Sequence, residues 1–417
     1  MFVLEQIIQA LEAGDLQALQ SLIDRFLIDA EPAKQYEMAE MLMQFGYLQE
    51  ADRILENLQF IFPEEAQIKI DRATVLMELT KEDEALNLLL EVKETDAEYP
   101  QALVVLADYY QMQGLFEVAE KHIELALEIL PHEPLLQFAK AELLFETGRF
   151  TESVRLYEEL YENKIDIPNA SIPVRLAEVY RAGAAYEDAL HFYMLALEDE
   201  VTPDLLFGSA YAAFQIEKYE TAIQQLEDLT ELDPDYFSAY LLLAQSYLML
   251  EDHKRALITM EQGIARDEYD KSFYLFAGKM ALKLGDSEKA KKYLQEAIAL
   301  DPEYMEATLV LTSVYRQEDD FEAIIDLYES LHKEAIDFSA LLPFVAEAYD
   351  QEEQFEKASE AYNLAYDEFK EDEQFLEKYC YFLIEDGQQD KAKTVAQQLV
   401  ALDPTNEDWQ LLFERFE

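Results

Sequence analysis

A spacing of about 34 residues recurs along this 417-residue chain and restricts how it can fold. It is clearest in five glycines, which are separated by 68, 34, 137 and 102 residues, all close to multiples of 34. The glycines are Gly46, Gly114, Gly148, Gly285 and Gly387. With each glycine at position 15 of a unit, eleven units begin at Pro32, Ala66, Pro100, Pro134, Ala170, Pro203, Phe237, Lys271, Met305, Ser339 and Glu373. A fixed period of this length predicts an array of repeated helical or strand units.

Small residues confirm the phase independently of the glycines. Position 20 is alanine in nine of the eleven units, the exceptions being Ser153 and Ile324. Position 8 is alanine in eight units and Gly278, Thr312 or Cys380 in the others. Apolar residues between these positions follow the i, i+3, i+4, i+7 spacing of amphipathic helices. Each unit is therefore predicted to be two helices that pack closely through positions 8 and 20, with a turn of positive φ at position 15.

One helix pair cannot bury its own apolar face, so the pairs are expected to stack into a continuous solenoid over residues 32–404. Residues 1–31 are interpreted as a degenerate helix pair that turns near Gly14. Residues 405–417 are interpreted as a capping helix, with Thr405 or Asn406 as its N-cap and Trp409 among its buried residues. The phase slips by two residues at 161–173, where a loop or slight kink is expected rather than a domain boundary.

The units resemble the tetratricopeptide repeat (TPR). The matching segments are ALADYY, GLFEVA, GRFTES, AEVYRAG, AYEDAL, AEAYDQ and QFEKAS, although the usual tryptophan at position 4 is missing from every unit. The resemblance covers about nine-tenths of the chain and implies an all-α, right-handed superhelical solenoid of stacked antiparallel helix pairs. The whole chain also resembles the long, acidic, all-TPR cytosolic proteins of low-G+C Gram-positive bacteria.

The charge and composition exclude several classes of function. Lys and Arg number 32 against 89 Asp and Glu, so the net charge of −57 disfavours nucleic acid and anionic membranes as partners. No export signal or membrane-spanning run is present, so a cytoplasmic protein without membrane insertion is expected. The single cysteine, five scattered histidines and isolated glycines predict no metal site, no cofactor and no catalytic centre. The chain is therefore interpreted as non-enzymatic.

The family resemblance places ligand-facing residues at positions 2, 5, 9, 12 and 13 of each unit, with position 6 nearby. The N-terminal positions are acidic and apolar, whereas segment 254–292 carries nine basic and six acidic residues, a net charge of +3. A mid-groove site for a peptide is therefore predicted at Arg175, Glu178, Arg181, Phe207, Tyr211, Phe214, Lys279, Lys283 and Arg316. The alternatives are that the aromatic residues pack between units and that outer lysines such as Lys289 merely relieve repulsion.

These features predict a protein-binding scaffold, adaptor or chaperone-like protein that uses its concave groove. Its partners would be proteins or peptides, with basic segments favoured by the acidic surface. The alternative is a peptide-sensing TPR regulator, although such proteins carry an N-terminal effector domain for which no room is left here. The oligomeric state stays open, because Phe2, Leu4 and Phe416 can either cap the ends or join two chains.

Overall fold

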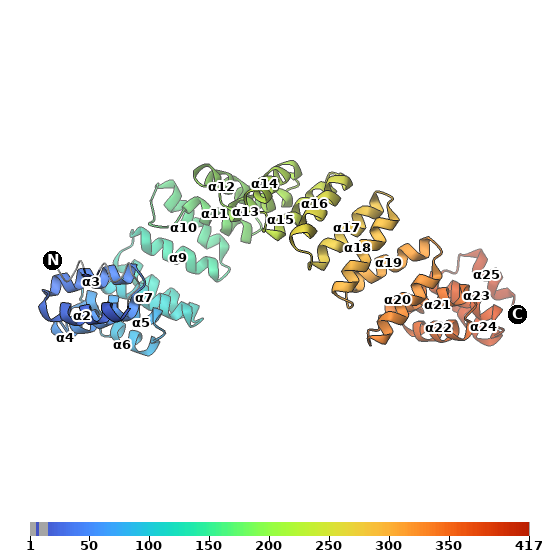
Figure 1. The fold of residues 1–417 in the computed structure, drawn as a ribbon, viewed down its shortest axis with the longest axis horizontal. Helices are drawn as coiled ribbons and strands as arrows, with labels where there is room; N and C mark the ends of the chain where they lie inside the picture. Colours follow the sequence, from blue (N-terminus) through green and yellow to red (C-terminus); the bar gives the residue numbers. More distant parts are fainter. Residues whose placement is uncertain (1–5, 8–15, 417) are drawn as a thin grey trace. The chain divides into compact units, whose positions relative to one another are not determined.

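The computed structural model of the protein describes residues 6–7 and 16–416, which form helices joined by short turns (Figure 1). Within these described ranges there is no β-strand, and an isolated bridge joins Ile167 and Ala170. The predicted all-α solenoid of helix pairs is confirmed. The chain forms two compact units, Met1–Gly208 and Ser209–Glu417, and the dividing line lies inside helix α13.

The helices follow one another in pairs, and the first and second helix of a pair are called its A helix and B helix below. Those of the first half are α2 (Leu16–Asp29), α3 (Pro32–Gln44), α4 (Leu48–Ile61), α5 (Ala66–Glu78), α6 (Glu82–Leu90), α7 (Tyr99–Met112), α8 (Phe116–Ile129), α9 (Pro134–Glu146), α10 (Phe150–Glu162), α11 (Ile172–Ala182), α12 (Tyr186–Asp199) and α13 (Pro203–Gln215). Those of the second half are α14 (Tyr219–Leu232), α15 (Phe237–Met249), α16 (His253–Arg266), α17 (Lys271–Lys283), α18 (Ser287–Leu300), α19 (Met305–Gln317), α20 (Phe321–Lys333), the 3-10 turn η1 (Ser339–Leu341), α21 (Leu342–Gln351), α22 (Phe355–Phe369), α23 (Glu373–Glu385), α24 (Gln389–Leu402) and α25 (Glu407–Glu414).

The turn between the A and B helices always uses one residue with positive φ. All eleven positions predicted for this turn have it, and five of them are the glycines that define the period. The others are Thr80, Ala184, Glu217, Glu251, Asp319 and Glu353. A β-branched residue is disfavoured at positive φ, so the backbone of Thr80, at φ 59°, adopts an unfavourable conformation in this turn.

Within a pair, the helices meet through the small residues at positions 8 and 20. The Ser153 hydroxyl of α10 donates to the carbonyl oxygen of Ala141 in α9, at 2.8 Å. The Cys380 thiol of α23 lies 3.5 Å from the carbonyl oxygen of Ala392 in α24. In the pair α17 and α18, a Cβ added at Gly278 would lie only 2.9 Å from Cγ of Leu294. Larger side chains at these positions would therefore push the helices apart.

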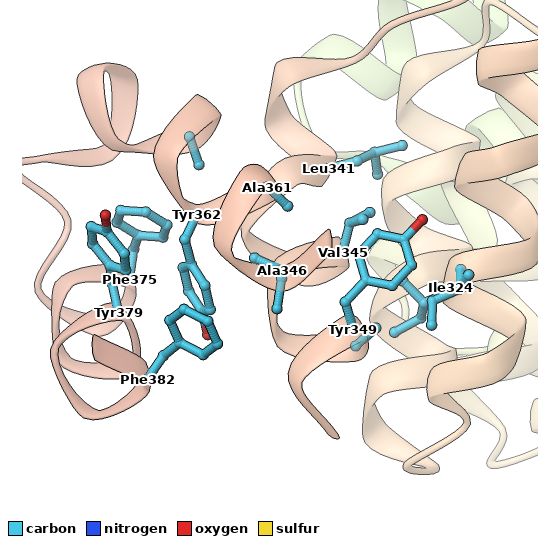
Figure 2. Packing of buried hydrophobic residues seen from close by; sticks show 14 of the residues in the cluster. Ile324, Leu341, Val345, Ala346, Tyr349, Ala361, Tyr362, Phe375, Tyr379 and Phe382 are labelled. Atoms are coloured by element: carbon cyan, nitrogen blue, oxygen red, sulfur yellow. The ribbon is translucent and has the colours of Figure 1, made fainter. Parts of the chain in front are cut away.

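Aromatic rings fill the core where α21, α22 and α23 meet (Figure 2). The ring of Tyr362 in α22 lies 5.1 Å from that of Tyr379 and 5.0 Å from that of Phe382, both in α23, between ring centroids. Phe375 completes the group, with its centroid 5.9 Å from that of Tyr362. Such ring pairs add specific geometry to the burial of apolar area, so the last repeats form one continuous core.

The two ends differ in what the structure describes. The C-terminal helix α25 begins after Asn406, whose side chain accepts a hydrogen bond from the backbone N–H of Asp408 at 3.1 Å. Trp409 and Leu412 of this helix are buried, as expected for a cap. At the other end, α2 is the second helix of the predicted pair in residues 1–31. Most of the first helix, together with Phe2, Leu4 and the turn near Gly14, lies outside the described residues.

The loop expected where the phase slips is present between α10 and α11. It contains the bridge of Ile167 to Ala170 and two residues with positive φ, Lys164 and Asn169. The line that divides the compact units falls elsewhere, within α13.

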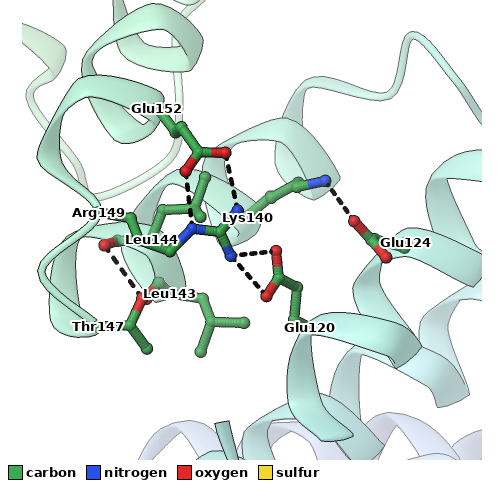
Figure 3. A network of polar contacts seen from close by, with 8 residues as sticks. All are labelled: Glu120, Glu124, Lys140, Leu143, Leu144, Thr147, Arg149 and Glu152. Carbon is green, nitrogen blue, oxygen red and sulfur yellow. Dashed lines mark hydrogen bonds and ion pairs between the residues drawn. The ribbon is translucent and has the colours of Figure 1, made fainter. Parts of the chain in front are cut away.

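Many of the scarce cations join neighbouring repeats. Arg149, at the start of α10, contacts both carboxylate oxygens of Glu120 in α8 at 2.6 and 2.7 Å, and also binds Glu152 at 2.8 and 2.7 Å (Figure 3). In the same network Lys140 of α9 pairs with Glu124 of α8 at 2.9 Å. The contacts with Glu120 and Glu124 span two consecutive repeats, so these cations offset carboxylate repulsion where the repeats meet.

Candidate functional site

In the first compact unit, the predicted cations of α11 are already paired within the protein. Nε of Arg175 lies 3.0 Å from Oε1 of Glu142 in α9, and its Nη1 lies 2.8 Å from Oε2 of Glu178. Tyr157 also donates its hydroxyl to Glu142. Arg181 donates from Nε to the hydroxyl oxygen of Tyr193 in α12, at 3.0 Å. The structure thus brings Arg175 and Glu178 together as a pair and directs Arg181 to a tyrosine.

The predicted aromatic stripe lies along α13. Phe207, Tyr211 and Phe214 share one helix face and are each half-buried. Phe214 contacts the ring of Tyr219 edge-on, with centroids 5.5 Å apart. The stripe spans the line that divides the two compact units, between Phe207 and Tyr211. The ring contact of Phe214 lies within one repeat, between α13 and the start of α14.

In the second compact unit, two of the three predicted cations are paired with carboxylates. Lys279 of α17 pairs through Nζ with Glu306 of α19. Lys283, at the end of α17, is exposed and forms no ion pair within the described part of the chain. Arg316 of α19 binds Glu347 of α21, with Nε 2.9 Å from Oε2. Of the three, Lys283 is the one whose charge is left for a ligand.

Arg316 does line a hollow of about 130 Å³ formed by α19, α21, α22 and α23. Glu347 also lines it and is bound by Arg316 through one carboxylate oxygen and by Lys378 of α23 through the other. The Arg316 guanidinium also lies 5.6 Å from the centre of the Phe344 ring, and Phe375 belongs to the apolar wall. The hollow thus combines apolar rings with the linked ion pairs of Arg316, Glu347 and Lys378.

Sequence reasoning missed Phe344 and Lys378 as residues of this hollow. Both occupy position 6 of their repeats, which was treated as merely near the ligand-facing positions. Phe344 and Lys378 lie beside Arg316 because three successive A helices stack on one another. The repeat register shows that all three residues are on A helices, but it does not show how far apart their side chains lie.

Several carboxylates on the A helices are packed without a cation. Burial raises the pKa of Asp350 in α21 above its usual 3.8, and repulsion from Glu385 and Glu347 raises it further. Burial likewise raises the pKa of Asp71 in α5, although Tyr36 donates a hydrogen bond to it at 2.6 Å that acts in the opposite direction. Desolvation also raises the pKa of Asp108 in α7, although this residue is exposed at the surface. A cation beside any of these carboxylates would stabilise its charged form.

Among residues 6–7 and 16–416, no group of three or more His, Cys, Asp or Glu is arranged to hold a metal ion. Burial raises the pKa of the Cys380 thiol to about 11, which keeps it protonated at neutral pH. No described helix is long and apolar enough to span a bilayer.

Comparison with known proteins identifies relatives along the whole chain. Family models match at residues 111–165 (YpiA-like, tetratricopeptide repeats), 344–406 (YpiA-like, C-terminal tetratricopeptide repeats), and 207–271 and 272–304 (tetratricopeptide repeat). The TPR repeat-containing protein YpiA of Bacillus subtilis is 35% identical over 415 residues, covering 100% of this chain and 98% of the relative.

Two solved structures share lower similarity. The C-terminal part of a TPR repeat-containing protein from Cytophaga hutchinsonii matches with a TM-score of 0.47 and 18% identity, over 66% of this chain and 98% of that one. YrrB, described as a TPR protein with an unusual peptide-binding site, matches with a TM-score of 0.39 and 20% identity, over 45% of this chain and 96% of that one.

Proposed function

The chain belongs to the YpiA-like tetratricopeptide-repeat proteins, and from this premise we propose that it is a cytoplasmic adaptor that binds basic segments of other proteins. Tetratricopeptide repeats serve as protein-interaction scaffolds, and proteins of this kind are typically non-enzymatic. The adaptor binds through its A-helix face, which we define as positions 2, 5, 6, 9, 12 and 13 of each repeat. The site residues Arg175 to Arg316 predicted from the sequence remain part of this proposal.

The observation that carries the proposal is the crowding of Asp350, Glu347 and Glu385 on the A helices α21 and α23. Desolvation and repulsion from Glu385 and Glu347 raise the pKa of Asp350, so the charge of Asp350 is held at a cost in the free protein, whereas Glu347 is already paired with Arg316 and Lys378. A lysine or arginine of a partner would remove that repulsion on binding. The neighbouring hollow, with Phe344 and Phe375 in its wall, offers an apolar contact for the residue beside that cation.

Charge complementarity of this kind speeds association and makes it sensitive to salt. The uncompensated Asp71 and Asp108 of the first compact unit extend the same chemistry to earlier A helices. The proposed partner segment therefore carries several basic residues spaced among apolar ones.

The test compares two variants that remove the same amount of charge. One replaces Asp350→Asn and Glu385→Gln on the A-helix face, and the matched control replaces Glu356→Gln and Glu360→Gln, which are exposed on α22. Wild type and both variants are immobilised and used to capture proteins from cytosolic lysate at low and high salt, and the captured proteins are identified by mass spectrometry.

We expect proteins with basic segments to be retained at low salt by the wild type and the control, and lost from the A-helix variant. They should also be lost from the wild type at high salt. Identical capture by the two variants would contradict binding through the A-helix face. Capture of a broad set of unfolded proteins that does not depend on salt would indicate a chaperone-like role instead of an adaptor.

A further inference from the structure

One helix pair, α19 and α20, is packed less closely than nine other pairs of the described chain. These helices approach each other over a shorter stretch than do α3 and α4, α5 and α6, α7 and α8, α9 and α10, α11 and α12, α15 and α16, α17 and α18, α21 and α22, or α23 and α24. At positions 8 and 20 the pair has Thr312 and Ile324, each 1% exposed, where most pairs have two small residues. A buried isoleucine at position 20 needs more room than the alanine that most pairs have there, which accords with the wider separation of the two helices.

Beside the separated pair lies a hollow of about 520 Å³, which we call the α18–α20 hollow. Its floor contains the buried residues Ile298 of α18, Leu311 of α19 and Leu331 of α20. Its rim contains the exposed residues Asp326 and Glu334. The volume falls within the range of ligand pockets, roughly 300–1,000 Å³.

The hollow is distinct from the A-helix face. Tyr315 lines the α18–α20 hollow, whereas the next residue, Arg316, lines the hollow between α19, α21, α22 and α23. Consecutive residues of a helix point about 100° apart, so the two sites lie on different faces of α19. A ligand can occupy one without touching the other.

The charges around the hollow favour a basic occupant. Of the described residues that line it, none is Lys or Arg. Asp326 and Glu334 form no ion pair within the described chain. An apolar floor beneath two uncompensated carboxylates is complementary to an apolar side chain with a cation next to it.

We propose that the α18–α20 hollow is a second binding site, which takes one aliphatic or aromatic residue of a partner protein together with an adjacent lysine or arginine. The apolar residue covers Ile298, Leu311 and Leu331. The cation pairs with Asp326 or Glu334 at the rim. The site would let the protein hold a second segment, of the same or another partner, while the A-helix face is occupied.

The probe is a synthetic peptide with a central photoreactive benzoylphenylalanine flanked by lysines, and its counterpart has glutamates in place of the lysines. Each is irradiated with the full-length protein, and the cross-linked residues are located by mass spectrometry. Ala299→Arg places a bulky cation at the edge of the hollow. Ala265→Arg, the matched control, adds the same charge at the equivalent exposed position of the preceding repeat, next to last in α16 as Ala299 is in α18.

We expect the lysine peptide to cross-link within residues 295–302 or 323–334, and the glutamate peptide to do so at least ten-fold less. Ala299→Arg should lower this cross-linking at least ten-fold, while Ala265→Arg leaves it unchanged. Circular dichroism of both variants checks that the helices are intact. Absence of cross-linking in these segments, or an equal loss in both variants, would overturn the proposal. A wild-type dimer in sedimentation that Ala299→Arg dissociates would overturn it in favour of a second copy as the occupant.

Discussion

Ile324→Ala tests whether side-chain bulk sets the separation of α19 and α20. Ile324 is 1% exposed, and Figure 2 shows it in the same cluster as Val345 and Tyr349 of α21. The substitution removes three buried carbons, worth about 2.4 kcal/mol at ~0.8 kcal/mol each. If the cavity left by the substitution stayed empty, the loss in the free energy of unfolding would rise towards about 5 kcal/mol, the upper end for replacing a buried isoleucine by alanine.

We expect the cost to stay near about 2.4 kcal/mol, because α19 and α20 can then close over a small residue as other pairs do. Leu294→Ala is the matched control, since it removes the same number of carbons from a residue that is fully buried in α18. Its helix is already close to α17, where a Cβ at position 278 would lie 2.9 Å from Cγ of Leu294. That pair cannot close further, so the cavity should persist and the cost should be larger.

A repeat protein of this length can unfold in parts, so the free energy is best measured locally. Native-state hydrogen exchange with mass spectrometry reports the opening free energy of peptides from α17 and α18 and from α19 and α20 in each variant. A loss for Ile324→Ala that equals or exceeds the loss for Leu294→Ala would refute the idea that bulk holds the helices apart.

Three further predictions concern the turns and the charges. Thr80→Gly should raise the free energy of unfolding by about 1 kcal/mol, because Thr80 is held at positive φ, whereas Thr74→Gly in the middle of α5 should lower it; denaturant-monitored exchange of α5 and α6 measures both. Asp350→Asn should raise Tm at pH 7, because the raised pKa of Asp350 means that the folded state prefers its protonated form. This gain should shrink as the pH is lowered through the raised pKa towards 3.8, and a gain that is undiminished at pH 3.8 would argue against the electrostatic cause. Moderate salt should raise the wild-type Tm, because it screens the repulsion of a net charge of −57; a fall in Tm would show that the ion pairs between repeats outweigh that repulsion.

The fold followed from the sequence because the repeat depends on a few backbone requirements. Position 15 was recognised from five glycines, and the structure has positive φ there even at Glu217 and Asp319. The tight packing of Gly278 against Leu294 and of Cys380 against Ala392 follows from the same register, since the period fixes which residues face each other. These features are local or are repeated many times, so one chain contains enough examples to reveal them.

The candidate site could be predicted less well, because side-chain pairing is decided between repeats. Arg175 and Arg316 were correctly placed on A helices, but nothing in the period indicated that Glu142 and Glu347 would bind them. Those partners lie 33 and 31 positions away, and whether a long side chain reaches one depends on its rotamer. The α18–α20 hollow was not predicted either, although Thr312 and Ile324 beside it depart from the alanine that most units have at positions 8 and 20.

The distribution of positive charge bears on why the A-helix face is so acidic. With 32 cations against 89 carboxylates, each cation relieves most repulsion where it reaches two carboxylates at once. Arg149 reaches Glu120 and Glu152, and Lys291 reaches Glu288 and Glu318, in both cases linking adjacent repeats. Cations used in this way are unavailable to Asp350, which then depends on a charge from outside the chain. The same pairing that stabilises the stack of repeats therefore leaves a surface whose repulsion a basic partner relieves.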